Sequence, residues 1–325
     1  MLLSREELKV ASMVNIEKIS AIALTVSDID RAERFYTQAL GFKLVDDVTF
    51  DESSYCKLAD IPPTKVRLMT LQLGDEFIEL IEYLDLTAQS IPLDSQSNDL
   101  WFQHFAIVVR DMDLAYQHLK SYEFEPISTE PQTIPDDNPM AGGVRAFKFR
   151  DGDRHALELI WFPQDKRKDK WQQDTDNLFL GIDHSAISIA DTEESLQFYR
   201  GLLGMEVAAS NLNQGKVQAD LDGLPVAEVR VTPLKPFQSS IGVEFLDYIK
   251  PECDRPIPDA WQINDLAHMH YVVEVADLKA SWQQLQQHNV AIISSEIVEF
   301  ANSYRYSRGC LIKDPNGHDL LLVSP

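Results

Sequence analysis

Residues 19–44, ISAIALTVSDIDRAERFYTQALGFKL, recur at residues 182–207 as IDHSAISIADTEESLQFYRGLLGMEV. An Asp, a Phe-Tyr pair and a Leu-Gly pair stand at matching places in both copies, and the Asp residues are Asp28 and Asp191. Repetition within one chain indicates a tandem architecture, and it has to be recognised before single elements are assigned. The chain is therefore predicted to consist of two similar halves.

Each half is itself doubled. HFAIVVRDMDLAYQHL (104–119) and HYVVEVADLKASWQQL (270–285) follow the same plan: an alternating apolar strand, an Asp where the strand ends, then an amphipathic helix. The Asp can cap the exposed N–H groups of that helix. Three more strands follow in each unit, and the last of them is almost continuously apolar. The sequence predicts four strand–helix–three-strand modules, at residues 17–83, 102–163, 181–249 and 266–325.

The modules are expected to group into two domains, 17–163 and 181–325. Polar stretches that contain Pro separate successive modules, as expected of linkers. Residues 1–16 form an N-terminal extension that is expected to add a helix.

Composition excludes several kinds of partner. Apolar residues make up 44% and charged residues 25%, as in an ordinary soluble protein, and no apolar run approaches membrane-spanning length. A net charge of −23 disfavours phosphate backbones and anionic lipids, so we expect neither nucleic acid nor membrane as a partner. Three scattered cysteines and a charged N-terminus without a signal peptide indicate a cytoplasmic protein.

The module plan and two short motifs resemble the glyoxalase/bleomycin resistance/dioxygenase superfamily, also called the vicinal oxygen chelate superfamily. The motifs are FYxxxLG after the helix and DPxG before the last strand; residues 314–317 read DPNG, and residues 151–154 read DGDR, a degenerate copy. The resemblance covers nearly all of the chain. It implies an α+β fold in which βαβββ modules pair into two curved-sheet barrels, each around a cavity.

The resemblance also implies one metal ligand from the first strand and one from the last strand of each module. In chain order, the first-strand places hold Ala21, His104, His184 and His270, and the last-strand places hold Glu79, Glu158, Glu244 and Leu321. A Glu inside an apolar strand stays charged only with a cation or hydrogen bonds beside it. The alternatives are Glu side chains on an open, solvated sheet face and histidines hydrogen-bonded in the core. Because His and Glu recur at equivalent positions of the modules, we favour the interpretation that they bind a metal ion.

Two module pairings are compatible with these places. If neighbours pair, each cavity keeps three ligands, as in two-domain extradiol dioxygenases, although Leu321 replaces their essential carboxylate. If modules two and three pair, one cavity holds an intact two-His, two-Glu set, while Glu79 and His270 remain in a degenerate one, as in fused glyoxalase I enzymes. We favour the second pairing, because it places both positions that lack a ligand residue, Ala21 and Leu321, in the same cavity.

The favoured metal site is His104, Glu158, His184 and Glu244. This mixed nitrogen and oxygen set suits a divalent first-row ion, namely Fe, Mn, Co, Ni or Zn, with open positions for substrate. Glu158 or Glu244 would act as the catalytic base. The predicted function is a metal-dependent lyase or isomerase, glyoxalase I-like or epimerase-like, acting on a small oxygen-rich chelating molecule, in a monomer or homodimer.

Two other functions stay open, and with them the question of whether the chain is an enzyme. One is a non-haem Fe(II) dioxygenase of the extradiol type, and the other is a metal-free small-molecule binding or resistance protein. Arg145 and Arg308 occupy matching places and would bind an acidic substrate, unless they are ordinary surface charges. Tyr304 and Tyr306 are candidates to line the cavity of module four.

Overall fold

The computed structural model describes residues 14, 16–50, 54–172, 175–238, 240–253, 255–300 and 304–324. The predicted N-terminal helix falls almost wholly outside these residues. Every module begins with the predicted strand and helix, and the α+β class is confirmed. Among the described residues, module one has the predicted three strands after its helix, whereas modules two, three and four have four, because two short strands stand where one was predicted. Among the described residues, no helix combines the length and the apolar character needed to cross a membrane.

Module one is the most regular of the four. Its helix begins after Asp28 and ends at Gly41, whose φ of 75° is the left-handed conformation that glycine adopts without strain. The elements are β1 (Ile16–Thr25), α2 (Ile29–Leu40), β2 (Lys43–Phe50), the 3-10 helix η1 (Cys56–Leu58), β3 (Val66–Leu73) and β4 (Glu76–Tyr83).

In module two, the first two strands after the helix are very short, and a 3-10 helix follows the last strand of the module. The elements are β5 (Gln103–Val109), α3 (Met112–Leu119), β6 (Glu125–Pro126), β7 (Gln132–Thr133), β8 (Arg145–Arg150), β9 (Ala156–Trp161) and η2 (Asp169–Trp171).

Module three departs from the plan by a short additional helix, α5, between its middle strands. Its first helix continues into a π-helical segment, η3. The elements are β10 (Phe179–Ile189), α4 (Thr192–Leu196), η3 (Gln197–Leu202), β11 (Glu206–Val207), β12 (Asn211–Gln214), α5 (Lys216–Asp222), β13 (Glu228–Lys235) and β14 (Gly242–Lys250).

Module four has the strand arrangement of module two, with two short strands that both pair with the third. Its elements are β15 (Met269–Val275), α6 (Leu278–Gln287), β16 (Ala291–Ile292), β17 (Val298–Glu299), β18 (Arg308–Lys313) and β19 (Asp319–Ser324).

An Asp begins the first helix of every module, as the sequence predicts. Each of these side chains accepts a hydrogen bond from the backbone N–H three residues further on, and so satisfies a donor that the helix itself leaves unpaired. The four residues are Asp28, Asp111, Asp191 and Asp277.

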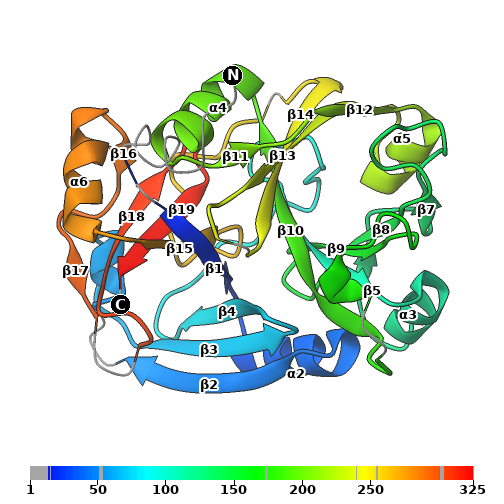
Figure 1. The fold of residues 1–325 in the computed structure, drawn as a ribbon. Coiled ribbons are helices and arrows are strands. Elements are labelled where there is room, and N and C mark those ends of the chain that lie inside the picture. The colour runs from blue at the N-terminus through cyan, green and yellow to red at the C-terminus, as the bar shows by residue number, and fades with distance from the viewer. Residues whose placement is uncertain are drawn as a thin grey trace.

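Strand pairing joins modules two and three, and modules one and four. One sheet has the order β16-β18-β19-β15-β1-β4-β3-β2, and the other has the order β11-β13-β14-β10-β5-β9-β8-β6. The first strands meet at the centre of each sheet, where β1 is antiparallel to β15 and β5 is antiparallel to β10. In Figure 1 the blue β1 lies beside the C-terminal strands, and β5 and β9 lie beside β10. The favoured pairing is therefore the one present, and each sheet combines strands from both halves of the sequence.

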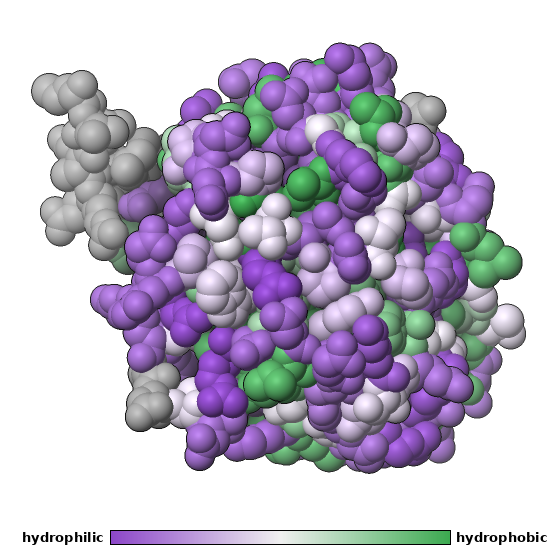
Figure 2. All heavy atoms as spheres, turned by 90° about the vertical axis from the view of Figure 1, so that its right-hand side faces the viewer, coloured by the Kyte–Doolittle hydropathy of each residue, from purple (hydrophilic) through white to green (hydrophobic). Residues whose placement is uncertain are grey.

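The two sheets differ in what covers their inner faces. In the sheet of modules one and four, the aromatic rings of Phe50, Tyr55, Phe300 and Tyr304 pack with aliphatic side chains in one continuous buried cluster. In the sheet of modules two and three, the buried apolar residues form two smaller clusters instead. The polar ligand places of this second sheet lie between them, and the molecular face on this side is mostly hydrophilic, with scattered apolar residues (Figure 2).

Candidate metal centre

The four favoured ligand residues lie on four consecutive strands of one sheet. Glu244 is on β14, His184 on β10, His104 on β5 and Glu158 on β9, in the order in which these strands pair. The register explains why they converge. Ala106 pairs with Glu158, and Ala186 pairs with Glu244, so each Glu lies two residues beyond the His of its own module on the neighbouring strand.

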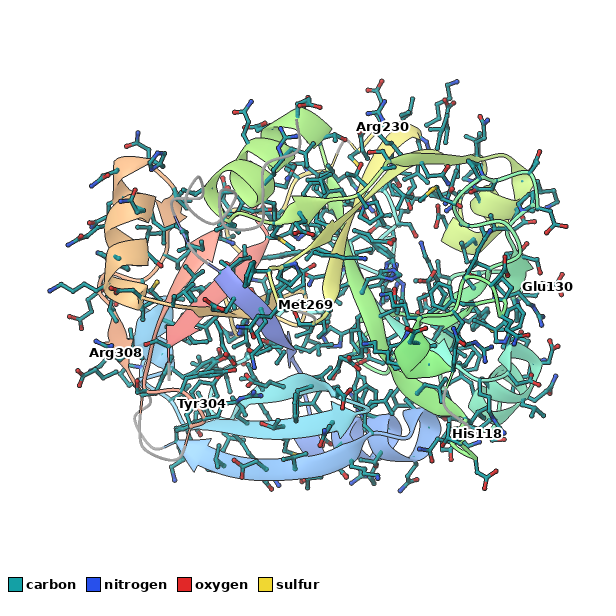
Figure 3. The ribbon with its side chains drawn as sticks, in the orientation of Figure 1. His118, Glu130, Arg230, Met269, Tyr304 and Arg308 are labelled. Atoms are coloured by element: carbon teal, nitrogen blue, oxygen red, sulfur yellow. The ribbon has the colours of Figure 1, made fainter. Side chains whose placement is uncertain are left out.

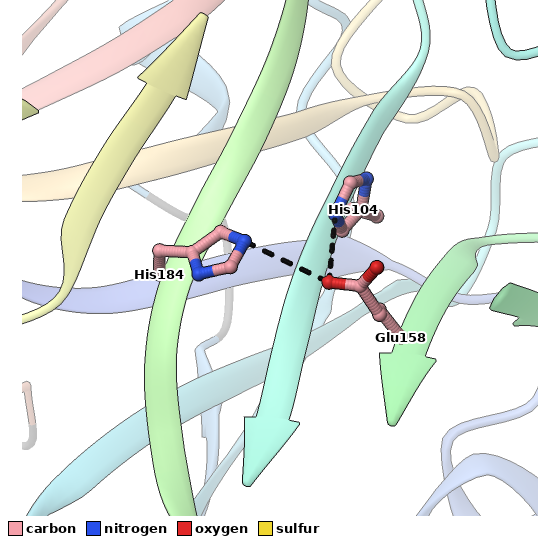
Figure 4. A group of neighbouring side chains, drawn as sticks. All are labelled: His104, Glu158 and His184. Carbon is pink, nitrogen blue, oxygen red and sulfur yellow. Dashed lines mark ion pairs between the residues drawn. The ribbon is translucent and has the colours of Figure 1, made fainter. Parts of the chain in front are cut away.

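The donor atoms of this group lie close together. The Nε2 atoms of His104 and His184 are 3.6 and 3.7 Å from Oε2 of Glu158. Figure 4 shows both histidines directed toward this carboxylate oxygen. Nε2 of His184 is also 3.4 Å from Oε2 of Glu244. Among the described residues, His104, Glu158 and His184 form the group whose ligand atoms all lie within 4.8 Å of one another.

These separations fit a shared ion better than direct hydrogen bonds, which are normally shorter than about 3.2 Å. Ligand atoms placed about 2.1 Å from a first-row ion lie roughly 3.0–3.4 Å apart in octahedral or tetrahedral geometry. The donor set of two imidazoles and carboxylates, without thiolates, also matches such an ion. The residues present therefore fit a divalent metal.

Asp183 orients His184. A β-bulge between Ile182 and His184 lets these two adjacent residues contact each other, and Nδ1 of His184 is 3.2 Å from Oδ2 of Asp183. A carboxylate on one ring nitrogen fixes the tautomer and directs the lone pair of the other nitrogen toward a ligand. Lys168 in turn donates to Asp183. Nδ1 of His104 is buried and has no such partner among the described residues.

Burial and neighbouring charges set the protonation states. Burial disfavours a charged imidazole, but Glu244, Asp183 and Glu158 together raise the pKa of His184 to about 9. Burial lowers the pKa of His104 to about 4. Burial opposes ionisation of Glu158, yet the neighbouring His104 and the charge of Lys148 lower its pKa to about 2. Burial raises the pKa of Glu244. The two carboxylates therefore have different acidities.

The group lines a cavity of about 260 Å³. Its walls are largely apolar, with contributions from Ile134, Met140, Val144, Phe162 and Leu221. The polar residues Lys148, Lys166, Asn211, Asn213 and Gln218 also line it. An apolar cavity with a few convergent polar groups is typical of a small-molecule site.

The corresponding places in modules one and four form no such group. Both ring nitrogens of His270 already have partners, because Nδ1 is 3.0 Å from Nε2 of His268 and Nε2 is 3.2 Å from the hydroxyl of Tyr55. Glu79 is fully buried and accepts a hydrogen bond of 3.0 Å from Tyr304. Burial raises the pKa of Glu79 to about 7 and lowers that of His270 to about 3.

The remaining candidates lie elsewhere. Arg145 forms an ion pair with Asp113, and Arg308 is exposed at the periphery of the molecule (Figure 3), so neither lines the cavity. Tyr304 lies among buried aromatic rings between the strands of modules one and four, and Tyr306 donates to Ser20.

Sequence reasoning missed three residues of the site: Asp183, Lys148 and Gln218. Asp183 precedes a predicted ligand directly, which is a signal that could have identified it. Lys148 interrupts the apolar strand sequence AFKF, as Glu158 interrupts ALELI. Gln218 belongs to the additional helix α5, and no pattern in the sequence indicates its role.

The sequence model of the Glyoxalase/Bleomycin resistance protein/Dioxygenase superfamily matches the chain twice, at residues 18–159 and at residues 181–322. The chain belongs to this superfamily.

Individual relatives match the chain less completely. A 2-epi-5-epi-valiolone epimerase of Actinomyces sp is 33% identical over 150 residues, which are 44% of this chain and 78% of the epimerase. The uncharacterised protein YwkD of Bacillus subtilis (strain 168) is 29% identical over 146 residues, which are 44% of this chain and 96% of that protein. In both, the alignment spans less than half of the present chain.

Solved structures match over almost the whole chain. Glyoxalase I of Zea mays has a TM-score of 0.63 at 18% identity and covers 95% of this chain and 92% of its own. A putative dioxygenase of Bacillus subtilis has a TM-score of 0.58 at 11% identity, and the match covers 96% of this chain and 86% of the dioxygenase chain. At these identities the likeness establishes the fold alone.

Proposed function

We propose that the protein is a metal-dependent isomerase or lyase acting on a small oxygen-rich chelating molecule. His104, Glu158, His184 and Glu244 would hold one divalent ion. The observation that carries this proposal is the convergence of His104, Glu158 and His184 in a cavity, with Glu244 3.4 Å from His184.

Glu158 and Glu244 differ in pKa and in solvent exposure, and we assign them different roles for that reason. A bound divalent ion would supply Lewis acidity toward a chelating substrate oxygen. Glu158 has a low pKa and a side chain only 6% exposed, which suits a permanent ligand. Glu244 has a raised pKa and a side chain 25% exposed, which suits a base that takes a proton from a substrate C–H and returns it elsewhere on the molecule. The hydrogen bond between Asp183 and His184 would hold that ligand in one orientation.

One relative supports this class of reaction, because the protein that is 33% identical over part of the chain is named an epimerase. We expect a monomer or a homodimer with a small-molecule substrate.

A non-haem Fe(II) dioxygenase is the second candidate. His104, His184 and Glu158 make up a set of two histidines and one carboxylate, which is the ligand set of many iron oxygenases. Two observations favour the isomerase or lyase. A second carboxylate, Glu244, lies beside His184, and the sheets do not pair neighbouring modules as the resemblance to extradiol enzymes requires.

The decisive experiment combines metal analysis with proton exchange. Protein dialysed against buffer should retain about one divalent ion per chain by elemental analysis. The metal-loaded protein should catalyse exchange of a substrate C–H with deuterium from D2O, measured by NMR across a panel of 2-hydroxyketones and 2-hydroxyaldehydes. Glu244→Gln should reduce the exchange rate at least 100-fold. Glu79→Gln, the same substitution at the matching place in the other sheet, should leave it unchanged.

The rival functions give different results. Consumption of oxygen by the Fe(II)-loaded protein with catechols, without C–H exchange, would identify the dioxygenase. Protein that binds no divalent ion, yet still binds small molecules, would identify a metal-free binding protein.

A further inference from the structure

Lys148 faces the candidate metal centre. On β8 it pairs directly with Glu158 on β9, and residues directly opposite on antiparallel strands project from the same face of the sheet. The four modules provide an internal comparison at this register position. Opposite Glu79, Glu244 and Leu321 stand Thr70, Pro233 and Leu311, so the lysine is particular to the module that contributes Glu158.

Helix α5 holds the Lys148 ammonium in place. Nζ of Lys148 donates to Oδ1 of Asp222 at 2.7 Å, and both side chains are almost completely buried. Gln218, from the same helix, donates to the other oxygen of Asp222 at 2.8 Å. The ion pair with the buried carboxylate of Asp222 favours the charged form of the ammonium. Of its three donor protons, one has this acceptor, and the residue lines the cavity.

The charges around the cavity leave a positive excess. A divalent ion would balance Glu158 and Glu244. Asp222 balances Lys148, and Asp183 balances Lys168. Lys166 also lines the cavity, and its ammonium donates to the uncharged carbonyl of Gly142. A positive site inside apolar walls attracts an anion strongly, even in a chain with a net charge of −23.

We propose that Lys148 is a substrate-binding residue that selects an anionic chelator, a molecule that places a carboxylate oxygen on the Lys148 ammonium while its other oxygens bind the ion. This inference rests on the proposed function, because it requires the ion. Helix α5, which has no α-helical counterpart between the middle strands in the described residues of the other modules, fixes the ammonium through Asp222 before the ligand arrives. A preformed donor of this kind costs little ordering on binding, so its contribution to affinity is large.

Oxalate is a suitable probe, because it is a small dianion that chelates through two oxygens. Its affinity for the metal-loaded protein is measured by titration calorimetry, and metal content is determined in each sample afterwards. We expect oxalate to bind the metal-loaded protein and not the metal-free protein. Lys148→Met should weaken oxalate binding at least 10-fold while the metal content stays unchanged.

Two further variants separate the effect of the Lys148 ammonium on oxalate affinity from an effect on folding. Lys148→Met leaves Asp222 buried without its cation and can therefore unfold the protein, so the double variant Lys148→Met/Asp222→Asn removes both charges together. This double variant should show the same loss of oxalate affinity. Lys216→Met removes an exposed lysine from the same helix and should change oxalate affinity less than twofold.

The outcomes distinguish this inference from the function on which it rests. Wild-type protein that binds no divalent ion contradicts the proposed function. Protein that binds the ion but not oxalate, or whose folded Lys148 variants bind both as the wild type does, overturns the role of Lys148 and leaves the metal centre intact.

Discussion

His104 and His184 belong to different halves of the sequence, yet their rings are 6.0 Å apart, and both approach the same oxygen of Glu158. They are adjacent because β5 and β10 pair antiparallel at the centre of one sheet. A site built across the two halves has consequences that a site within either half would not have.

The first consequence is that substitutions at these two histidines are not additive. His104→Ala or His184→Ala alone should weaken metal affinity at least 100-fold, about 2.7 kcal/mol, because each removes a direct bond. The double variant should lose little more, since ligands of one ion act as a unit. Calorimetric titration of metal-free protein with a divalent ion measures all three. Equal, independent losses would mean that the two residues bind different ions.

His270→Ala is the matched control for that experiment. The His270 ring nitrogens contact His268 and Tyr55, so this variant should retain the ion, although it removes a buried ring and lowers thermal stability. Loss of the ion from a folded His270→Ala protein would contradict the assignment of the site to modules two and three.

The second prediction concerns Asp183. Asp183→Asn keeps the shape of the side chain but removes the charge beside Nδ1 of His184, so metal affinity should fall 10- to 100-fold. The same titration measures the change. Asp176→Asn, at an exposed position outside the cavity, should have no effect. Similar affinities in both variants would exclude an orienting role for Asp183.

The third prediction is a pH dependence of stability due to Glu79. Its pKa in the folded protein is about 7, above the ordinary value of 4.5, so between these values the folded state binds more protons than the unfolded state. Stability from this group is therefore lost as pH rises, by about 3 kcal/mol between pH 4 and pH 8. His270, whose pKa is lowered to about 3, acts in the opposite direction below pH 6.5.

Comparison with Glu79→Gln isolates the carboxyl group, because His270 is present in both proteins. Relative to the wild type, the variant should gain stability as pH rises from 5 to 8, measured by urea denaturation in the absence of metal. Glu123→Gln, an exposed substitution with the same change of charge, should follow the wild type. Parallel pH profiles for Glu79→Gln and the wild type would show that Glu79 is already ionised at pH 5.

The sequence by itself determined the modules and the candidate ligands. Strand alternation, a capping Asp and the FYxxxLG motif are local features, and each acts within a few residues of where it is found. They specified four helices that begin after Asp28, Asp111, Asp191 and Asp277, and an apolar last strand in each module. Buried Glu residues at equivalent places identified Glu158 and Glu244 for a similar reason, since an apolar strand does not accommodate an unpartnered carboxylate.

Only the tertiary structure decided which modules share a cavity and which side chains complete it. Pairing between β5 and β10 depends on contacts between distant parts of the chain, and the repeat allowed either pairing. The same holds for Lys148, whose position against Glu158 and Asp222 requires β8, β9 and α5 to be packed together. It also holds for His270, a chemically competent ligand whose nitrogens are occupied by His268 and Tyr55. Local patterns specify elements, whereas a site depends on which elements meet.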